Sequence, residues 1–197
     1  DTSSVGNRKH QWTGENFTNL YAADMGAEGS LSSIVKFGDN LNTLFHESTP
    51  VFTKDGKTAY FTRNNYLGKK GKDKDDTILL KIYKATLEGN KWGDIKELPF
   101  NSNEYSVAHP ALSFDEKTLY FSSDMPGSQG QSDLYKVNIN SDGSFSTPVN
   151  LGNLINTEGR ETFPFISQND ELYFASDGHP GLGGLDIFVS NLEKTGT

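Results

Sequence analysis

Two glutamates in similar surroundings are the first candidates for chemistry in this sequence. Glu47 and Glu161 each stand three residues before a proline, Pro50 and Pro164. A pair of carboxylates about 5 to 9.5 Å apart can hydrolyse a glycosidic bond, one as general acid and the other as nucleophile or base. The middle stretch of this kind has Val107 at the corresponding place, so no third acidic residue recurs. We therefore expect solvated side chains or partner contacts here, and no catalytic pair.

Nucleophilic hydrolysis finds no support in the sequence either. The chain contains no Gly-x-Ser-x-Gly elbow, and its histidines are scattered, at His10, His46, His109 and His179. A catalytic triad is recognised by a nucleophile, a base and an orienting acid in defined roles. We predict no catalytic residues and a protein that is not an enzyme.

Metal and phosphate sites are not predicted. Asp133 and Asp186, with Asn19 in register, precede a strand, and their side-chain oxygens are expected to accept backbone N–H groups of the loop. Calcium needs several converging oxygens, and these residues show no compact ligand spacing; without cysteine there is no thiolate site. The glycines of residues 178–184 join two strands and open no helix, so they offer no phosphate loop. We predict no metal and no cofactor.

An internal repeat positions these residues. Residues 109–137 run strand, hairpin, strand, glycine-rich loop, strand, and the same order occurs before and after them. Adding 114 to a residue number between 17 and 50 gives an equivalent residue without a gap. Such pairs are Leu20 and Leu134, Asn42 and Asn156, and Glu47 and Glu161.

The pattern of a complete repeat predicts four strands separated by turns and loops. In the second unit the expected strands are Pro50–Thr53, Ala59–Arg63, Leu80–Ala85 and Lys91–Leu98. Asp55-Gly56 supplies the positive φ of a tight hairpin between the first two. One ring of each second-strand Tyr-Phe pair is expected to pack between neighbouring sheets. The pairs are Tyr60-Phe61, Tyr120-Phe121 and Tyr173-Phe174.

The repeat predicts an all-β protein, a β-propeller of four-stranded antiparallel blades, because one such sheet cannot bury both faces alone. The chain is expected to be a fragment of a little over three blades. Residues 1–43 form the second half of a blade, 44–101 and 102–157 full blades, and 158–197 a blade without its fourth strand.

Composition excludes some partners. The 197 residues include 18 Lys and Arg against 26 Asp and Glu, a net charge of -8, which opposes binding to nucleic acid or anionic membrane. No apolar run reaches the ~18 residues of a membrane span, and residues 1–20 lack the features of a signal peptide. We predict no nucleic-acid partner and no membrane span.

A charged insert lies between Asn64 and Thr77. It mixes lysines and aspartates without apolar anchors, so we expect a solvated hairpin tip. An anion site is the alternative. Its charged residues are Lys69, Lys70, Lys72, Asp73, Lys74, Asp75 and Asp76.

Three stretches carry a family resemblance: Phe114–Asp124, Asn150–Thr157 and, above all, Leu172–Phe188. With them, nearly the whole chain resembles the TolB-like, WD-like β-propeller repeats of periplasmic OmpA-family proteins in Bacteroidetes. Arg8 to Trp12, leading into Phe17, resemble the loop before a third strand in such proteins.

The resemblance implies a non-catalytic scaffold in the periplasm, associated with the outer membrane. Some such proteins belong to the type IX secretion and gliding machinery and link it to peptidoglycan through a further domain. The implied partner is a protein of that machinery, with peptidoglycan bound only through the further domain. The alternative is an accessory propeller of a hydrolase, either a peptidase or a glycan-active enzyme.

The candidate partner-binding surface is the rim of the propeller channel. Inner strands line that channel, so residues near their starts are expected to gather at one rim. The candidate residues are Glu47, Arg63, Glu104, His109, Arg160 and Glu161. Function is expected where the copies disagree: at His109, at Arg63 as aligned with Asp124 and Asp177, and in the charged insert.

Overall fold

The computed structural model describes residues 17–38, 40–43, 45–65 and 79–192. The charged residues of the insert, from Lys69 to Asp76, lie outside these residues, as do Arg8 to Trp12. The anion site considered for the insert therefore stays a sequence prediction.

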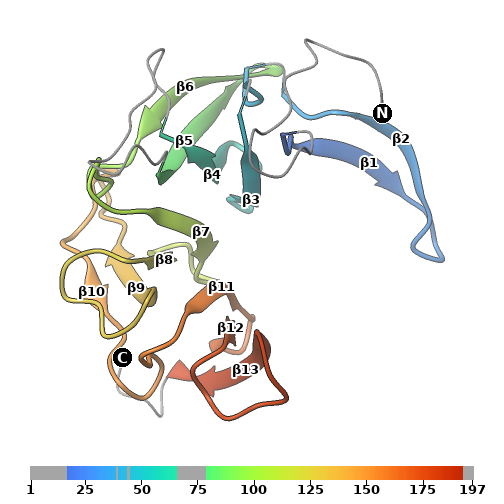
Figure 1. Ribbon diagram of the computed structural model, residues 1–197. Coiled ribbons are helices and arrows are strands. Elements are labelled where there is room, and N and C mark those ends of the chain that lie inside the picture. The colour runs from blue at the N-terminus through green and yellow to red at the C-terminus, as the bar shows by residue number, and fades with distance from the viewer. Residues whose placement is uncertain (1–16, 39, 44, 66–78, 193–197) are drawn as a thin grey trace.

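Antiparallel sheets follow one another along the chain (Figure 1). The first pairs β1 (Tyr21–Met25) with β2 (Leu31–Lys36). The second contains β3 (Glu47–Phe52), β4 (Thr58–Asn64), β5 (Leu80–Glu88) and β6 (Lys91–Glu97). The third contains β7 (Val107–Leu112), β8 (Thr118–Ser123), β9 (Asp133–Asn138) and the two-residue β10 (Val149–Asn150). The last contains β11 (Glu161–Ile166), β12 (Glu171–Ser176) and β13 (Asp186–Asn191).

The sheets stand around an arc, as Figure 1 shows. The first strands β3, β7 and β11 lie on its inner side, and β6 and β10 lie on its outer side. The all-β class and the four-stranded antiparallel sheets predicted from the repeat are confirmed. The inner strand of the second sheet begins three residues before the predicted Pro50, because Glu47 already pairs with Arg63.

Alternation along the second strands builds the core between sheets. Phe61 packs with Leu20 and Leu41 toward the first sheet, whereas Tyr60 packs with Phe121 toward the third. Successive side chains of a strand point to opposite faces, so neighbouring rings serve different interfaces. We predicted that one ring of each Tyr-Phe pair packs between sheets. In the second sheet both rings, Tyr60 and Phe61, do so.

The predicted Asp-Gly hairpin is confirmed. Gly56 has a φ of 67°, and Asp55 accepts hydrogen bonds from the Thr53 hydroxyl and from the Lys57 N–H. The next two sheets use Glu116 and Asp170 in the same left-handed conformation, with φ of 61° and 56°. The turn geometry thus recurs although glycine does not.

Three equivalent asparagines bond the chain that leaves a sheet back to that sheet: two of them to its third strand, and Asn42 to Leu20, directly before β1. The Asn156 side chain accepts a hydrogen bond from Leu134 N (2.8 Å) and donates one to Leu134 O (3.0 Å). Asn101 makes the same two bonds with Ile82. Asn42 does so with Leu20, so the predicted offset of 114 describes equivalent contacts as well as equivalent letters.

Replacement of Asn156 by alanine should lower the free energy of unfolding by about 2 to 3 kcal/mol, because buried backbone groups of Leu134 lose their partners. Chemical denaturation measures the change. Asn140, exposed and bonded through its side chain to Ser144, is the matched control, and its alanine variant should change stability by less than about 0.5 kcal/mol. Equal losses in the two variants would contradict this role for Asn156.

Candidate functional site

Glu161 lies at the start of β11 and is fully buried. Its carboxylate accepts hydrogen bonds from Thr157 N (2.8 Å), Thr157 Oγ1 (2.7 Å) and Ser176 Oγ (2.6 Å). Both oxygens are thus bound by the preceding linker and by the neighbouring strand β12. The Glu161 carboxylate therefore binds the start of the inner strand β11 to Thr157 of that linker.

Glu47 occupies the same position at the start of β3, and it too is buried. Thr43 donates to Glu47 Oε1 from its N–H (3.0 Å) and from its hydroxyl (2.5 Å), as Thr157 does to Glu161. The difference is Arg63, whose Nε lies 3.2 Å from Glu47 Oε1 where the last sheet has Ser176.

The Arg63 guanidinium is enclosed by its own sheet and by the linker that precedes it. It donates to Leu41 O (2.6 Å) and lies over the rings of Phe61 and Tyr83, at 5.0 and 5.1 Å from their centroids. Burial raises the pKa of Glu47, opposed by the bonds from Thr43 and by the charge of Arg63. Burial also lowers the pKa of Arg63, opposed by Glu47. Each charge therefore compensates the other in an environment that penalises both.

The expectation that Glu47 and Glu161 are solvated is wrong. Both carboxylates, and Arg63 with them, are at most 5% exposed. Among the described residues, the carboxylates of the two glutamates form their hydrogen bonds and ion pair within their own sheets and the preceding linkers, and none joins Glu47 to Glu161. These side chains hold the strands in place and offer no carboxylate to a solvent-borne substrate.

The sequence alignment of Arg63 with Asp124 and Asp177 is wrong by one residue. Arg63 pairs with Glu47 as Ser176 pairs with Glu161, so Arg63 corresponds to Ser176. Asn64 is the residue that corresponds to the aspartates. Its side chain accepts from His46 N, as Asp124 accepts from Ser106 N and Asp177 from Arg160 N.

The predicted role of the loop aspartates is confirmed. Asp133 accepts hydrogen bonds from Gln129 N and Gly130 N, and Asp186 from Leu182 N and Gly183 N. In the first repeat Asn19 differs, because its amide donates to Phe17 O. Within the described residues no cluster of three or more His, Cys, Asp or Glu could hold a metal ion.

The three histidines within the described residues make separate contacts. His46 Nδ1 accepts from Thr18 N, and His179 Nε2 lies 2.8 Å from Ile155 O. His109 lies in β7 on the inner side of the arc, and His10 lies outside the described residues.

Each inner strand carries one residue with positive φ directly before its proline. These residues are Thr49 (φ 46°), His109 (56°) and Phe163 (50°), each inside a register irregularity of its strand. Non-glycine residues rarely adopt this conformation, which costs about 1 to 3 kcal/mol and requires support from the surroundings. Because the feature recurs in three sheets, it belongs to the bulge of the inner strand. The side chains there differ, and so can their roles.

His109 joins the inner strands of neighbouring sheets. Its ring stacks on Phe163 with centroids 3.9 Å apart, and its Nδ1 lies 2.5 Å from Thr162 Oγ1. Its N–H donates to Thr62 Oγ1 of the preceding sheet. Burial lowers the pKa of His109 to about 4, so the imidazole is neutral at pH 7. His109, predicted as a rim residue, therefore has a structural role, because it connects inner strands along the inner side of the arc.

Arg160 remains available at the surface. Its backbone N–H donates to Asp177 Oδ1 (2.7 Å), its Nε to Oδ2 (2.9 Å), and its Nη2 lies 2.7 Å from Oδ2. These contacts, the backbone bond first, hold the pKa of Asp177 below its ordinary value. The Arg160 side chain is still 56% exposed. Glu104 is exposed in the linker before β7, so of the predicted rim residues Arg160 and Glu104 are the solvent-facing ones.

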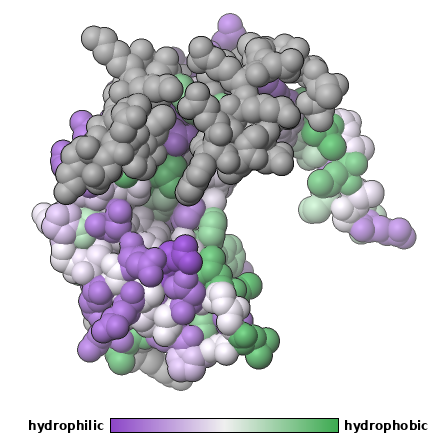
Figure 2. Space-filling model, in the orientation of Figure 1, coloured by the Kyte–Doolittle hydropathy of each residue, from purple (hydrophilic) through white to green (hydrophobic). Residues whose placement is uncertain are grey.

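The structure adds Phe163 to this surface. It is 49% exposed and lies three residues after Arg160. Figure 2 shows hydrophobic residues along the inner side of the arc, over β11 and β13. We call Arg160, Phe163 and His109 the inner-strand surface. Sequence reasoning could have found Phe163, because it precedes Pro164 as His109 precedes Pro110.

Comparison with solved structures identifies the architecture. The chain is similar to TolB from Acinetobacter baumannii, with 16% identity and a TM-score of 0.51, over 89% of this chain and 35% of that chain. The chain has a TolB-like β-propeller fold. It is also similar to a puromycin-hydrolyzing peptidase of Mycobacterium tuberculosis (17% identity, TM-score 0.53, 83% of this chain and 23% of that chain). A puromycin hydrolase gives 17% identity and a TM-score of 0.52, over 81% and 24%.

These similarities show the fold of the blades. The chain spans 23% to 35% of the length of these solved chains. No protein-family model matches the sequence, and a comparison with curated proteins gives no match. In the described part of the chain no helix is long and apolar enough to cross a membrane.

Replacement of His109 by asparagine should flatten the pH dependence of stability between pH 6.5 and 4. Because the folded-state pKa of His109 is lowered to about 4, the unfolded chain takes up this proton first as the pH falls. The free energy of unfolding of the unsubstituted protein should therefore decrease by at most about 3 kcal/mol across this window. Asparagine tolerates the positive φ, so the substitution removes the titration without adding backbone strain.

Denaturation curves at several pH values test this. The loss below pH 4 should persist in the variant, because Asp55, Asp115 and Asp177 have lowered pKa values and lose their hydrogen-bond stabilisation there. An unchanged slope between pH 6.5 and 4 would show that His109 is not the group responsible.

Proposed function

We propose that this propeller is a non-catalytic scaffold that binds a protein partner through the inner-strand surface. The observation that carries the proposal is Arg160, held by Asp177 and still 56% exposed directly before β11, with the half-exposed Phe163 in that strand. Arginine and large aromatic residues dominate the binding energy of protein interfaces. An arginine already oriented by a carboxylate loses less side-chain freedom when a partner arrives.

The buried carboxylates support the non-catalytic part of the proposal. Glu47 and Glu161 are the residues whose types would suit acid and base chemistry, and both are bonded inside the protein. Glu161 already accepts hydrogen bonds from three donors of the protein, so its carboxylate is engaged internally and faces no ligand.

The biological setting of the proposal comes from the sequence resemblance. The stretch Leu172–Phe188 resembles repeats of periplasmic OmpA-family proteins, and the fold is shared with TolB. We infer a periplasmic protein at the outer membrane, part of an OmpA-family protein that links a type IX secretion or gliding assembly to peptidoglycan. Peptidoglycan would be bound by a separate domain of that protein.

A second candidate is an accessory propeller of a hydrolase. The similarity of the blades to two puromycin-hydrolysing proteins favours it. The sequence of the complete gene separates the two candidates. A hydrolase domain in the same protein supports the second, and an OmpA-like domain supports the first.

A pull-down from periplasmic extract with the complete propeller as bait should recover an outer-membrane or secretion protein. Replacement of Arg160 and Phe163 by alanine should each weaken its capture by at least about tenfold, the effect of a loss of 1.4 kcal/mol or more.

The chain offers matched controls for both changes. Phe114 is 50% exposed in the hairpin between β7 and β8, and Lys96 forms an exposed ion pair with Asp94. Their alanine variants should bind normally. The proposal fails if the bait recovers no such protein, or if the control variants lose binding as much as the inner-strand variants do.

A further inference from the structure

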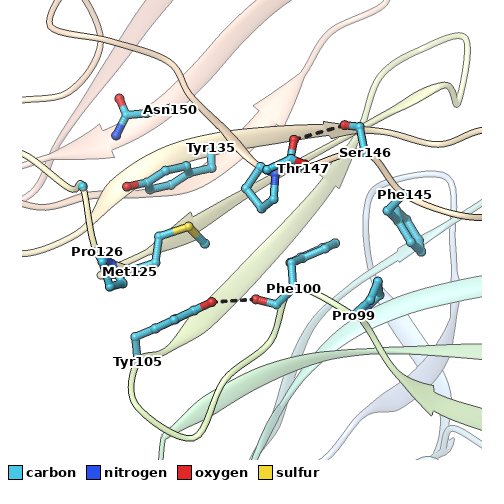
Figure 3. Close-up of a pocket in the computed structure, with 12 residues that line it drawn as sticks. Pro99, Phe100, Tyr105, Met125, Pro126, Tyr135, Phe145, Ser146, Thr147 and Asn150 are labelled. Carbon is cyan, nitrogen blue, oxygen red and sulfur yellow. Dashed lines mark hydrogen bonds between the residues drawn. The ribbon is translucent and has the colours of Figure 1, made fainter.

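A cavity of about 570 Å³ opens between the second and third sheets, away from the inner-strand surface. Figure 3 shows its walls, which come from the linker between β6 and β7, the loop after β8, and the segment leading into β10. A cavity of this size lies within the range of sites that bind small ligands or peptide side chains. None of its lining residues belongs to β11.

Rings form most of the walls. Three prolines and several aromatic residues surround the cavity, and no lining residue is charged. The principal ones are Pro99, Tyr105, Pro126, Tyr135, Phe145 and Pro148.

The floor of the cavity is fixed before any ligand arrives. Phe100, Met125 and Tyr135 are each less than 9% exposed and belong to the core between the two sheets. Phe100 stacks on Phe121 with centroids 4.8 Å apart and contacts Phe145 edge to face at 5.7 Å. A rigid wall of this kind binds without a large cost of reordering.

The polar groups of the wall are largely engaged within the protein. The Tyr105 hydroxyl donates to Phe100 O (3.2 Å), as Figure 3 shows, and the Tyr135 hydroxyl lies 2.8 Å from Ser128 Oγ. The Asn150 side chain donates to Asp133 and accepts from Gly152 N. An occupant that brings its own N–H groups into the cavity would leave them unpaired, which weakens binding. Proline brings an apolar ring and no backbone N–H.

Exposed acidic residues lie in the segments that form the cavity. Residues 97–105, 124–135 and 139–150 contain five acidic residues, of which Glu97 forms an ion pair with Lys81 and Asp133 is buried. Of these, Glu104, Asp124 and Asp142 are exposed. Glu104 is adjacent to Tyr105, and Asp124 to Met125, so the carboxylates flank wall residues. A partner with cations beside its apolar groups would be attracted.

We propose that this cavity binds an extended, proline-containing peptide segment that has lysine or arginine next to its prolines. Polyproline segments bind to surfaces lined by aromatic rings because their conformation is already fixed before binding. The ring-lined wall takes the prolines, and the exposed carboxylates take the flanking cations. This site is separate from the inner-strand surface and does not depend on the function proposed for it.

Fluorescence anisotropy with labelled synthetic peptides tests the proposal on the intact protein. The first probe is a run of prolines and leucines flanked by arginines. The second has serine in place of each proline, and the third has glutamate in place of each arginine. The first should bind, and each of the other two should bind at least about tenfold more weakly.

Variants of the wall locate the binding. Tyr105→Ala should weaken the first probe by about tenfold or more, and Pro126→Ala and Glu104→Lys by about threefold or more. Pro126 and Glu104 are exposed, so their variants should fold normally even if Tyr105→Ala destabilises the core. The matched controls are Pro180→Ala and Glu88→Lys, exposed residues outside the cavity, which should bind as the unsubstituted protein does. Absence of binding by the first probe, equal binding by the serine or glutamate peptide, or an equal loss in the controls would overturn the proposal.

Discussion

The hydrogen bonds that Thr157 gives to the buried carboxylate of Glu161 set the position of the inner strand, and the same contact recurs between Thr43 and Glu47. Each sheet must cover the face of its neighbour, so the linker between sheets has to arrive at a fixed place. The asparagine directly before each threonine fixes the other end of that linker to the preceding sheet, at Leu134 in β9 and at Leu20 directly before β1. Two adjacent side chains therefore determine where a blade ends and where the next begins.

This use of polar residues decides what remains for function. Carboxylates that would suit catalysis in an open channel are bonded and buried, so the exposed chemistry lies elsewhere. It lies in Arg160, held by an exposed ion pair, in Phe163, and in the ring-lined cavity between the second and third sheets. The left-handed residue before each inner-strand proline turns the side chains of His109 and Phe163 toward one another, so the strain of the bulge is used to join two blades.

The fold could be predicted from the sequence because the repeat consists of residue types with strong local preferences for turns and for strands. The offset of 114 placed Asn42 and Glu47 correctly against Asn156 and Glu161. It could not show that the glutamates are buried, because burial depends on the neighbouring linker and sheet. It misaligned Arg63 by one residue, although counting from the Tyr-Phe pairs aligns Arg63 with Ser123 and Ser176 without a gap. In a strand, an error of one residue assigns a side chain to the wrong face of the sheet. The cavity could not be predicted from the sequence, because it is formed by three segments that are separated along the chain.

The central claim is that the recurrent glutamates are structural and not part of a binding or catalytic site. Replacement of Glu161 by glutamine tests it most directly, because glutamine keeps the size but turns an N–H group toward donors from Thr157 or Ser176. The account predicts that the free energy of unfolding falls by about 1 to 3 kcal/mol. The folded variant should capture the protein partner as well as the unsubstituted propeller does. Unchanged stability together with lost binding, or with lost binding of cell-wall glycan fragments, would contradict it.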